Sequence, residues 1–144
     1  MVRFKDLNTN RALEATPLVV DGVMYFTSAW NIAYALDATN GEQIWQFDPE
    51  IPRTYARKAC CGVISRGLAV YRGRVYVATL DGRLFALDAA TGTPVWEVDT
   101  IVDHERNYSI TGSPRAAAGK IFTGNGGAEF GVRGYVTAYD CRDR

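Results

Sequence analysis

The chain has 144 residues, of which 47% are hydrophobic and 22% are charged, an ordinary balance for a globular domain with a packed core. Basic and acidic residues are equal at 16 each, so net charge does not favour nucleic acid or an anionic membrane as a partner. No stretch approaches the ~18 consecutive apolar residues of a membrane span, and residues 1–18 lack the apolar core of a secretory signal.

The first predicted elements lie in residues 17–49. The segment PLVVDGVMYFTSAWNIAYALDATNGEQIW begins at Pro17 with an apolar run, turns at Gly22 and returns through a run rich in aromatic residues. A second pair of short runs follows and ends at Trp45. Short apolar runs bounded by turn residues are typical of β-strands. This segment therefore predicts about four antiparallel strands.

Residues 67–100 repeat this arrangement, and residues 114–140 repeat most of it. Ala35 lies 51 positions before Ala86, which lies 52 positions before Ala138. Four-stranded units that recur about every 50 residues are typical of β-propeller blades. We predict an all-β fold, a partial propeller with about two and a half four-stranded blades. A β-sandwich with a coincidental duplication is the alternative.

Each of the two complete repeats ends in a glycine turn and a tryptophan. Asp37 and Asp88 can accept hydrogen bonds from the backbone of the turn that follows. Trp45 and Trp96 are placed to bury a large ring between neighbouring blades. We expect these residues to be structural.

A propeller closes with roughly four to eight blades, so we expect the chain to be a piece of a longer protein. After VTAYD the repeat predicts a sequence such as Ala-Glu-Thr-Gly, whereas the chain reads CRDR from Cys141 to Arg144. Reading codons for Ala-Glu-Thr-Gly one base early can give Cys-Arg-Asp-Arg. Our hypothesis is that residues 141–144 are a frameshifted tail.

Two cysteines are adjacent in RKACCGVISRG, at Cys60 and Cys61. Their Cα atoms are ~3.8 Å apart across a trans peptide, below the usual disulfide range of about 4.4–6.8 Å, so a disulfide would close a small strained ring. Two buried thiols are the simpler alternative. A metal site is disfavoured, because the C-x₂-C spacing is absent and His104 is the one histidine.

Two further features can carry chemistry. Arg66 follows the cysteines and offers a permanent charge with its donors in one plane, although a solvated surface charge is the alternative. The segment TGNGGAEFGVRG matches neither a P-loop nor a dinucleotide-binding turn. Its glycines Gly126 and Gly127 allow close approach of a ligand, and the Glu129 carboxylate suits a hard cation. A tight loop between strands is the structural alternative.

Together, the tryptophan-ending repeat, the adjacent cysteines followed by Ser-Arg-Gly, and GNGGAEFGVRGYVTAYD resemble the quinoprotein alcohol dehydrogenases, over residues 11–140. The resemblance implies the N-terminal blades of an eight-bladed propeller that binds pyrroloquinoline quinone (PQQ) with Ca²⁺ or a lanthanide. It also implies oxidation of an alcohol to an aldehyde by hydride transfer to the quinone, with cytochrome c or another electron acceptor. A periplasmic location follows from it, as does a haem c domain in some full-length members.

The resemblance assigns roles residue by residue. Cys60 and Cys61 match a vicinal disulfide that stacks on one face of PQQ, and Arg66 matches an arginine at the reactive quinone carbonyl. The other assignments are PQQ contacts at Glu14, Thr111, Gly127 and Ala128, and a metal ligand at Glu129.

The family's catalytic base is an aspartate well downstream of these motifs, so we expect no catalytic base in this chain and no turnover by the chain alone. Asp81, Asp88 and Asp99 are turn or repeat residues and do not replace it. Two alternatives remain: a non-catalytic propeller scaffold with the same repeat, and a sugar dehydrogenase on the same fold. The adjacent cysteines and GAEFGVRG count against both.

Overall fold

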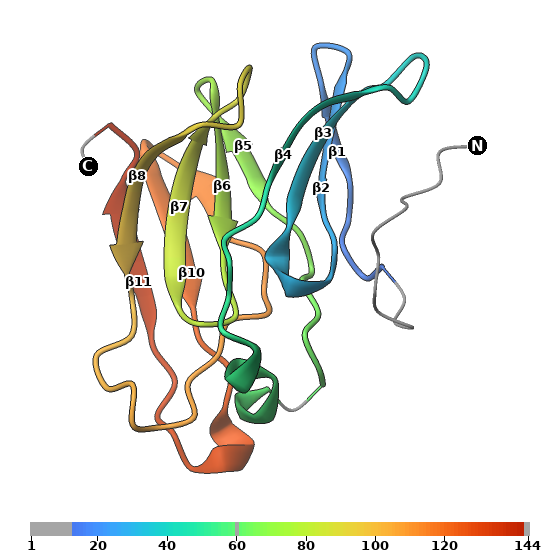
Figure 1. Cartoon of the computed structure of the whole chain (residues 1–144). Coiled ribbons are helices and arrows are strands. Elements are labelled where there is room, and N and C mark those ends of the chain that lie inside the picture. Colours follow the sequence, from blue (N-terminus) through green and yellow to red (C-terminus); the bar gives the residue numbers. More distant parts are fainter. Residues whose placement is uncertain (1–12, 60, 143–144) are drawn as a thin grey trace.

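A computed structural model describes residues 13–59 and 61–142 as three antiparallel sheets that follow one another along the chain (Figure 1). The first sheet has the order β1-β2-β3-β4, with strands Leu18–Val20, Val23–Thr27, Ala33–Asp37 and Gln43–Phe47. The second has the order β5-β6-β7-β8, with strands Ala69–Tyr71, Arg74–Ala78, Arg83–Asp88 and Pro94–Asp99. The third has the order β11-β10-β9, with strands Arg115–Ala117, Lys120–Gly124 and Val136–Asp140 for β9, β10 and β11. The all-β prediction of a partial propeller is confirmed.

Three short 3₁₀ helices lie in the connections between strands. They are η1 (Ala29–Asn31), η2 (Arg53–Lys58) and η3 (Ala128–Phe130). The helices η2 and η3 lie at the same end of the sheets as the loop after β8, the lower end in Figure 1. No helix in the described ranges is both long and apolar enough to cross a membrane.

The first two strands of every blade are joined by the same two-residue turn. Its central pairs are Asp21-Gly22, Arg72-Gly73 and Ala118-Gly119, and both residues of each pair have positive φ, between 48° and 78°. Two positive φ values in succession define the type I′ turn, whose twist matches that of the strands it joins. The pairing fixes the register, with Val20 opposite Val23 in the first blade and Tyr71 opposite Arg74 in the second.

The blades pack face to face, and their innermost strands are neighbours. Strand β5 contacts β1 on one side and β9 on the other, so the three inner strands lie side by side. Apolar side chains from both sheets fill the space between blades one and two: Tyr25, Ala33, Ala35, Trp45, Leu68, Val75, Val77, Phe85 and Leu87. Ile110, Ile121 and Cys141 join residues of the second sheet in the next interface. The core is thus divided into layers between blades.

Trp45 connects the first blade to the second. Its side chain is 7% exposed, and its Nε1–H donates to the Ala89 carbonyl at 2.9 Å. Gly92 lies so close to the indole that an added Cβ would be 2.6 Å from a ring carbon. The predicted burial of this ring between blades is confirmed, and the ring requires a glycine on the neighbouring blade.

Trp96 takes the same place between the second and third blades but bonds differently. It is equally buried, yet its Nε1–H has no acceptor among the described residues. The Cys141 carbonyl, which corresponds to that of Ala89, accepts instead from Arg74 Nη1 at 2.5 Å and from the Tyr76 hydroxyl at 3.4 Å. Arg74 therefore donates to the carbonyl whose counterpart, that of Ala89, accepts from Trp45 in the preceding interface.

The predicted aspartate turns form as expected. The hydroxyl and backbone N–H of Thr39 donate to the Asp37 carboxylate and hold the pKa of Asp37 below its ordinary value. The backbone N–H and hydroxyl of Thr91 have the same effect on the pKa of Asp88. Because these hydrogen bonds favour the charged carboxylates, both aspartates are ionised at neutral pH and the contacts are present there. They are lost only as the pH falls through the lowered pKa.

Cys141 occupies a regular position of the repeat. Its backbone N–H donates to the Gly119 carbonyl at 2.9 Å, as Ala89 does to Gly73, and its side chain is buried. The described structure thus continues the blade through Cys141. The frameshift hypothesis for residues 141–144 stays a prediction, and residues 143–144 lie outside the described ranges.

Two glycine substitutions separate backbone strain from packing against Trp45. Gly92 and Gly73 have φ values of 73° and 72°, but an added Cβ at Gly73 would meet no atom within 4 Å. Gly73→Ala should cost only the left-handed strain, about 1–2 kcal/mol, whereas Gly92→Ala should cost a further ~1–3 kcal/mol by overpacking. Urea unfolding followed by circular dichroism measures both. Equal losses of stability would contradict the docking role of Gly92.

Candidate functional site

The segment that carries Arg66 is fixed on both sides by buried neighbours. Val63 accepts a backbone hydrogen bond from Trp30 at 2.9 Å, and the Ser65 hydroxyl shares a buried 2.8 Å hydrogen bond with the Thr27 hydroxyl. Gly67 is buried as well, while Arg66 itself is exposed. The chain therefore anchors this segment to the first blade and presents one charged side chain away from the core.

Arg66 joins all three blades through hydrogen bonds. Its carbonyl accepts from Thr16 N at 3.3 Å, just before β1, and its backbone N–H donates to the Thr111 carbonyl at 3.0 Å. Its side chain also contacts Thr111, with Nη1 donating to the hydroxyl oxygen at 2.5 Å. The guanidinium is thereby held by a residue 45 positions along the chain.

Gly67 lets the inner segments approach closely. Its φ is 134°, and an added Cβ would lie 2.9 Å from the Ser113 hydroxyl oxygen and 3.4 Å from the Thr16 carbonyl oxygen. The positive φ is strained for any other residue, and a Cβ here would also require the Ser113 side chain to turn away. The glycine thus lies where the segments that enter all three inner strands meet.

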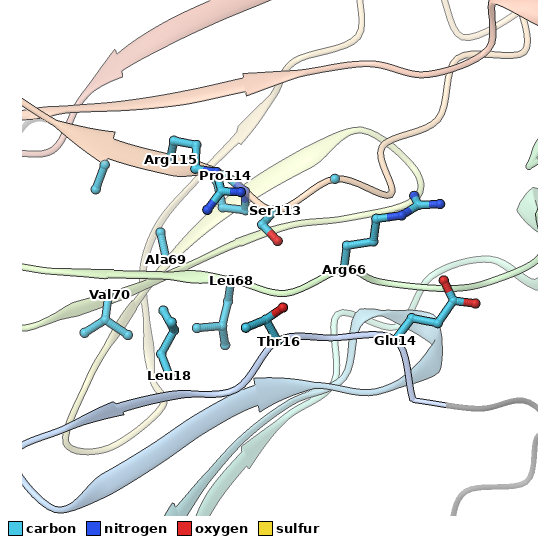
Figure 2. A pocket seen from close by; sticks show the side chains of 12 residues that line it. Glu14, Thr16, Leu18, Arg66, Leu68, Ala69, Val70, Ser113, Pro114 and Arg115 are labelled. Carbon is cyan, nitrogen blue, oxygen red and sulfur yellow. The ribbon is translucent and has the colours of Figure 1, made fainter.

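A cavity of about 840 Å³ lies along these inner segments. Figure 2 shows the side chains of Arg66 and Glu14 at the same end of it, from neighbouring segments. The lining residues come from the start of each blade: Glu14, Thr16, Leu18, Arg66, Leu68, Ala69, Val70, Gly112, Ser113, Pro114, Arg115 and Ala116. Of the predicted cofactor contacts, Glu14 and Arg66 line the cavity and Thr111 reaches it through Arg66.

Of the adjacent cysteines, the structure describes Cys61, which follows η2 in the sequence. Cys61 is exposed and forms no disulfide with another described residue, and its neighbour Cys60 lies outside the described residues. The predicted vicinal disulfide therefore stays a prediction. Neither Cys61 nor the Gly127–Glu129 loop lines the cavity.

The loop that carries Gly127, Ala128 and Glu129 packs against the segment leading to Thr111. Gly126 N donates to the Ser109 carbonyl at 2.8 Å. Gly127 has a φ of 108°, and an added Cβ would lie 2.6 Å from the Asn107 carbonyl oxygen. The structure thus gives Gly127 a packing role, in addition to the predicted ligand contact. Ala128 and Glu129 begin η3 and are exposed.

The residues present suit a flat anionic cofactor better than a complete metal centre. The cavity combines the guanidinium groups of Arg66 and Arg115 with the Ser113 hydroxyl and apolar side chains, and Glu14 adds one carboxylate. By contrast, no group of three or more metal-ligating side chains occurs in the described ranges. Ca²⁺ requires six to eight oxygen ligands, and Glu129 offers one carboxylate. The described residues therefore do not form a complete metal site.

Sequence reasoning missed Thr16, Ser113 and Arg115, which line the cavity. All three lie just before or at the start of an innermost strand, as Glu14 and Arg66 do. Alignment of the repeats could have found them, since the residues that enter each inner strand share one position in the blade.

Comparisons with known proteins agree with this architecture. The family model described as PQQ: Glucose/ethanol/alcohol dehydrogenase, beta-propeller domain, matches residues 2–143. The 1-butanol dehydrogenase (cytochrome c) of Thauera butanivorans is 56% identical over 135 residues, which cover 94% of this chain and 20% of that protein.

Two solved structures are similar in fold and sequence. The quinohemoprotein alcohol dehydrogenase ADHIIG of Pseudomonas putida HK5 has a TM-score of 0.90 and 58% identity, covering 94% of this chain and 20% of its own. A europium-containing methanol dehydrogenase has a TM-score of 0.85 and 42% identity, covering 91% of this chain and 23% of its own. The chain thus spans about a fifth of the length of these relatives. It belongs to the family of PQQ-dependent glucose, ethanol and alcohol dehydrogenases and forms part of their β-propeller domain.

Proposed function

We propose that this chain forms the N-terminal blades of a PQQ-dependent alcohol dehydrogenase and supplies one wall of its cofactor site. The observation that carries the proposal is the Arg66–Thr111 pair at the cavity between the inner strands, held by hydrogen bonds to all three blades. A fixed guanidinium in a preorganised cavity is a suitable partner for carboxylate and carbonyl oxygens.

PQQ, when bound, supplies the two-electron acceptor for the hydride of an alcohol. The residues of this chain bind and orient it. Arg66 holds a permanent positive charge where a carbonyl oxygen would gain negative charge, and such a preorganised charge lowers the barrier. Thr111 keeps the guanidinium in place, and Glu14 is proposed to contact the cofactor from the segment before β1. Cys60 and Cys61, joined as a vicinal disulfide, are proposed to cover one face of the ring.

The remaining assignments concern the intact enzyme. Glu129 is proposed as one ligand of a Ca²⁺ or lanthanide ion whose other ligands come from elsewhere. The electron acceptor is proposed to be a cytochrome, in line with the name of the Thauera relative, and the location to be periplasmic, where a strained disulfide persists. Haem c is proposed only for a longer form of the protein.

The two alternatives are weaker. A non-catalytic scaffold would need neither a charged residue at the cavity nor two adjacent cysteines. A sugar dehydrogenase shares the family description, but the relatives reported above are named for alcohols. The proposal is therefore alcohol oxidation, with the particular alcohol set by residues outside this chain.

Replacing Arg66 should weaken PQQ binding to the chain. Arg66→Gln removes a charge-assisted contact and should raise the Kd for PQQ about 10-fold to 100-fold, from the ~1.5–3 kcal/mol of such bonds. Quenching of tryptophan fluorescence by added PQQ measures the Kd. Arg72→Gln is the matched control, because Arg72 is an exposed arginine in the β5–β6 turn. Equal Kd values for both variants, or no saturable binding by the unmodified chain, would contradict the proposed site.

The chain loaded with PQQ and Ca²⁺ should not oxidise alcohols, because the proposed catalytic base lies outside it. A dye-linked assay with ethanol and 1-butanol, in which phenazine methosulfate accepts the electrons, measures turnover. Activity above that of PQQ and Ca²⁺ alone, lost in Arg66→Gln, would show that the chain contains a base we have not recognised.

A further inference from the structure

Three polar side chains outside the cavity form a continuous hydrogen-bonded chain. The Tyr55 hydroxyl lies 3.0 Å from His104 Nδ1, and His104 Nε2 lies 2.6 Å from Asp99 Oδ2. Tyr55 belongs to η2, Asp99 ends β8, and His104 lies in the loop that follows β8. The proposed cofactor chemistry uses none of the three.

Chemistry fixes the direction of these hydrogen bonds. Burial raises the pKa of Tyr55, so the phenol keeps its proton and can donate it. An ionised carboxylate only accepts, so His104 Nε2 carries a hydrogen and donates to Asp99. In the neutral imidazole, Nδ1 is then the acceptor of the Tyr55 O–H. In the imidazolium, Nδ1–H donates to the phenol oxygen, and the chain stays closed in either state.

Hydrophobic burial contributes little to holding η2 in place. None of its residues is buried, although Tyr55 and Ala59 pack partly against the Ile51–Val63–Leu80 cluster. At its start, the Arg53 guanidinium lies 4.1 Å from the centroid of the Trp30 ring. At its end, Lys58 Nζ donates to the His104 carbonyl at 2.6 Å, next to the Tyr55–His104 contact. In the sequence, Ala59 follows η2 and precedes the two cysteines.

The loop that receives these contacts has a fixed base. Thr100 donates to the Gly82 carbonyl through both its backbone N–H, at 2.9 Å, and its hydroxyl, at 2.7 Å. Ile101 N donates to Asp99 Oδ1 at 3.0 Å. Further along, the same connection reaches Thr111, which bonds Arg66. One connection between blades two and three therefore contacts both η2 and the cavity arginine.

We propose that Tyr55, His104 and Asp99 act as positioning residues, which hold η2 and Ala59 against the second blade and so position the segment that leads to Cys61. The tether itself stands on the contacts above. Only its purpose, to place the cysteines beside the cofactor, rests on the proposed function. The side chains touch neither the cavity nor the predicted PQQ contacts.

Hydrogen–deuterium exchange with mass spectrometry on the full chain tests the tether. His104→Ala and Tyr55→Phe should each raise amide exchange in residues 53–59 about fivefold, the effect expected from one lost hydrogen bond, and the double variant should exchange no faster than His104→Ala. His104→Gln should restore protection, because an amide can donate to Asp99 and accept from Tyr55. Exchange in β6 and β7 should stay unchanged in every variant.

Tyr139→Phe is the matched control, since Tyr139 lies in β11, and it should leave residues 53–59 unaffected. If residues 53–59 exchange at the wild-type rate in both Tyr55→Phe and His104→Ala, the tether is overturned. Faster exchange spread over β6 and β7, additive effects in the double variant, or no rescue by His104→Gln would also overturn it. The measurement needs no PQQ, so a chain that fails to bind PQQ would contradict the proposed function and leave this test standing.

Discussion

The close approach of three inner strands at Gly67 is the constraint on which the site depends. The space where a side chain would stand is bounded by the Ser113 hydroxyl and the Thr16 carbonyl. Because these groups belong to the segments that enter the first and third blades, three distant parts of the sequence meet at this glycine. Arg66, next to that glycine, lines the cavity. The apolar layers between blades stabilise the sheets, and the contacts around Gly67 position the neighbouring Arg66 guanidinium.

Local rules in the sequence were sufficient for the fold. The three type I′ turns, the aspartate turns and the tryptophan rings act within one blade or between adjacent ones, so the repeat alone predicts them. The Arg66–Thr111 contact is different, since it joins residues 45 positions apart and depends on how the blades pack. Resemblance supplied Arg66 and Thr111 separately, and the structure places them in contact. Ser113 and Arg115 were missed because no local motif marks a residue that enters an inner strand, and only alignment of the repeats singles out their shared position.

Two side chains show how packing changes the meaning of a motif. Gly127 was predicted to admit a ligand, and the structure shows that it also admits the Asn107 carbonyl. In the sequence, His104 served only as the single histidine that helps to disfavour a metal site, yet it bonds through both ring nitrogens to residues of η2 and β8. Neither contact can be predicted from spacing, because each depends on loops from different blades meeting at one end of the sheets.

The central claim is that PQQ binds in the cavity beside Arg66. A crystal structure of the chain with PQQ tests it most directly. The account predicts density for the tricyclic ring between the inner strands, with an oxygen of the cofactor within hydrogen-bonding distance of the Arg66 guanidinium. Density for PQQ at another surface, with the Arg66–Thr111 pair unchanged and the cavity filled only by solvent, would contradict it.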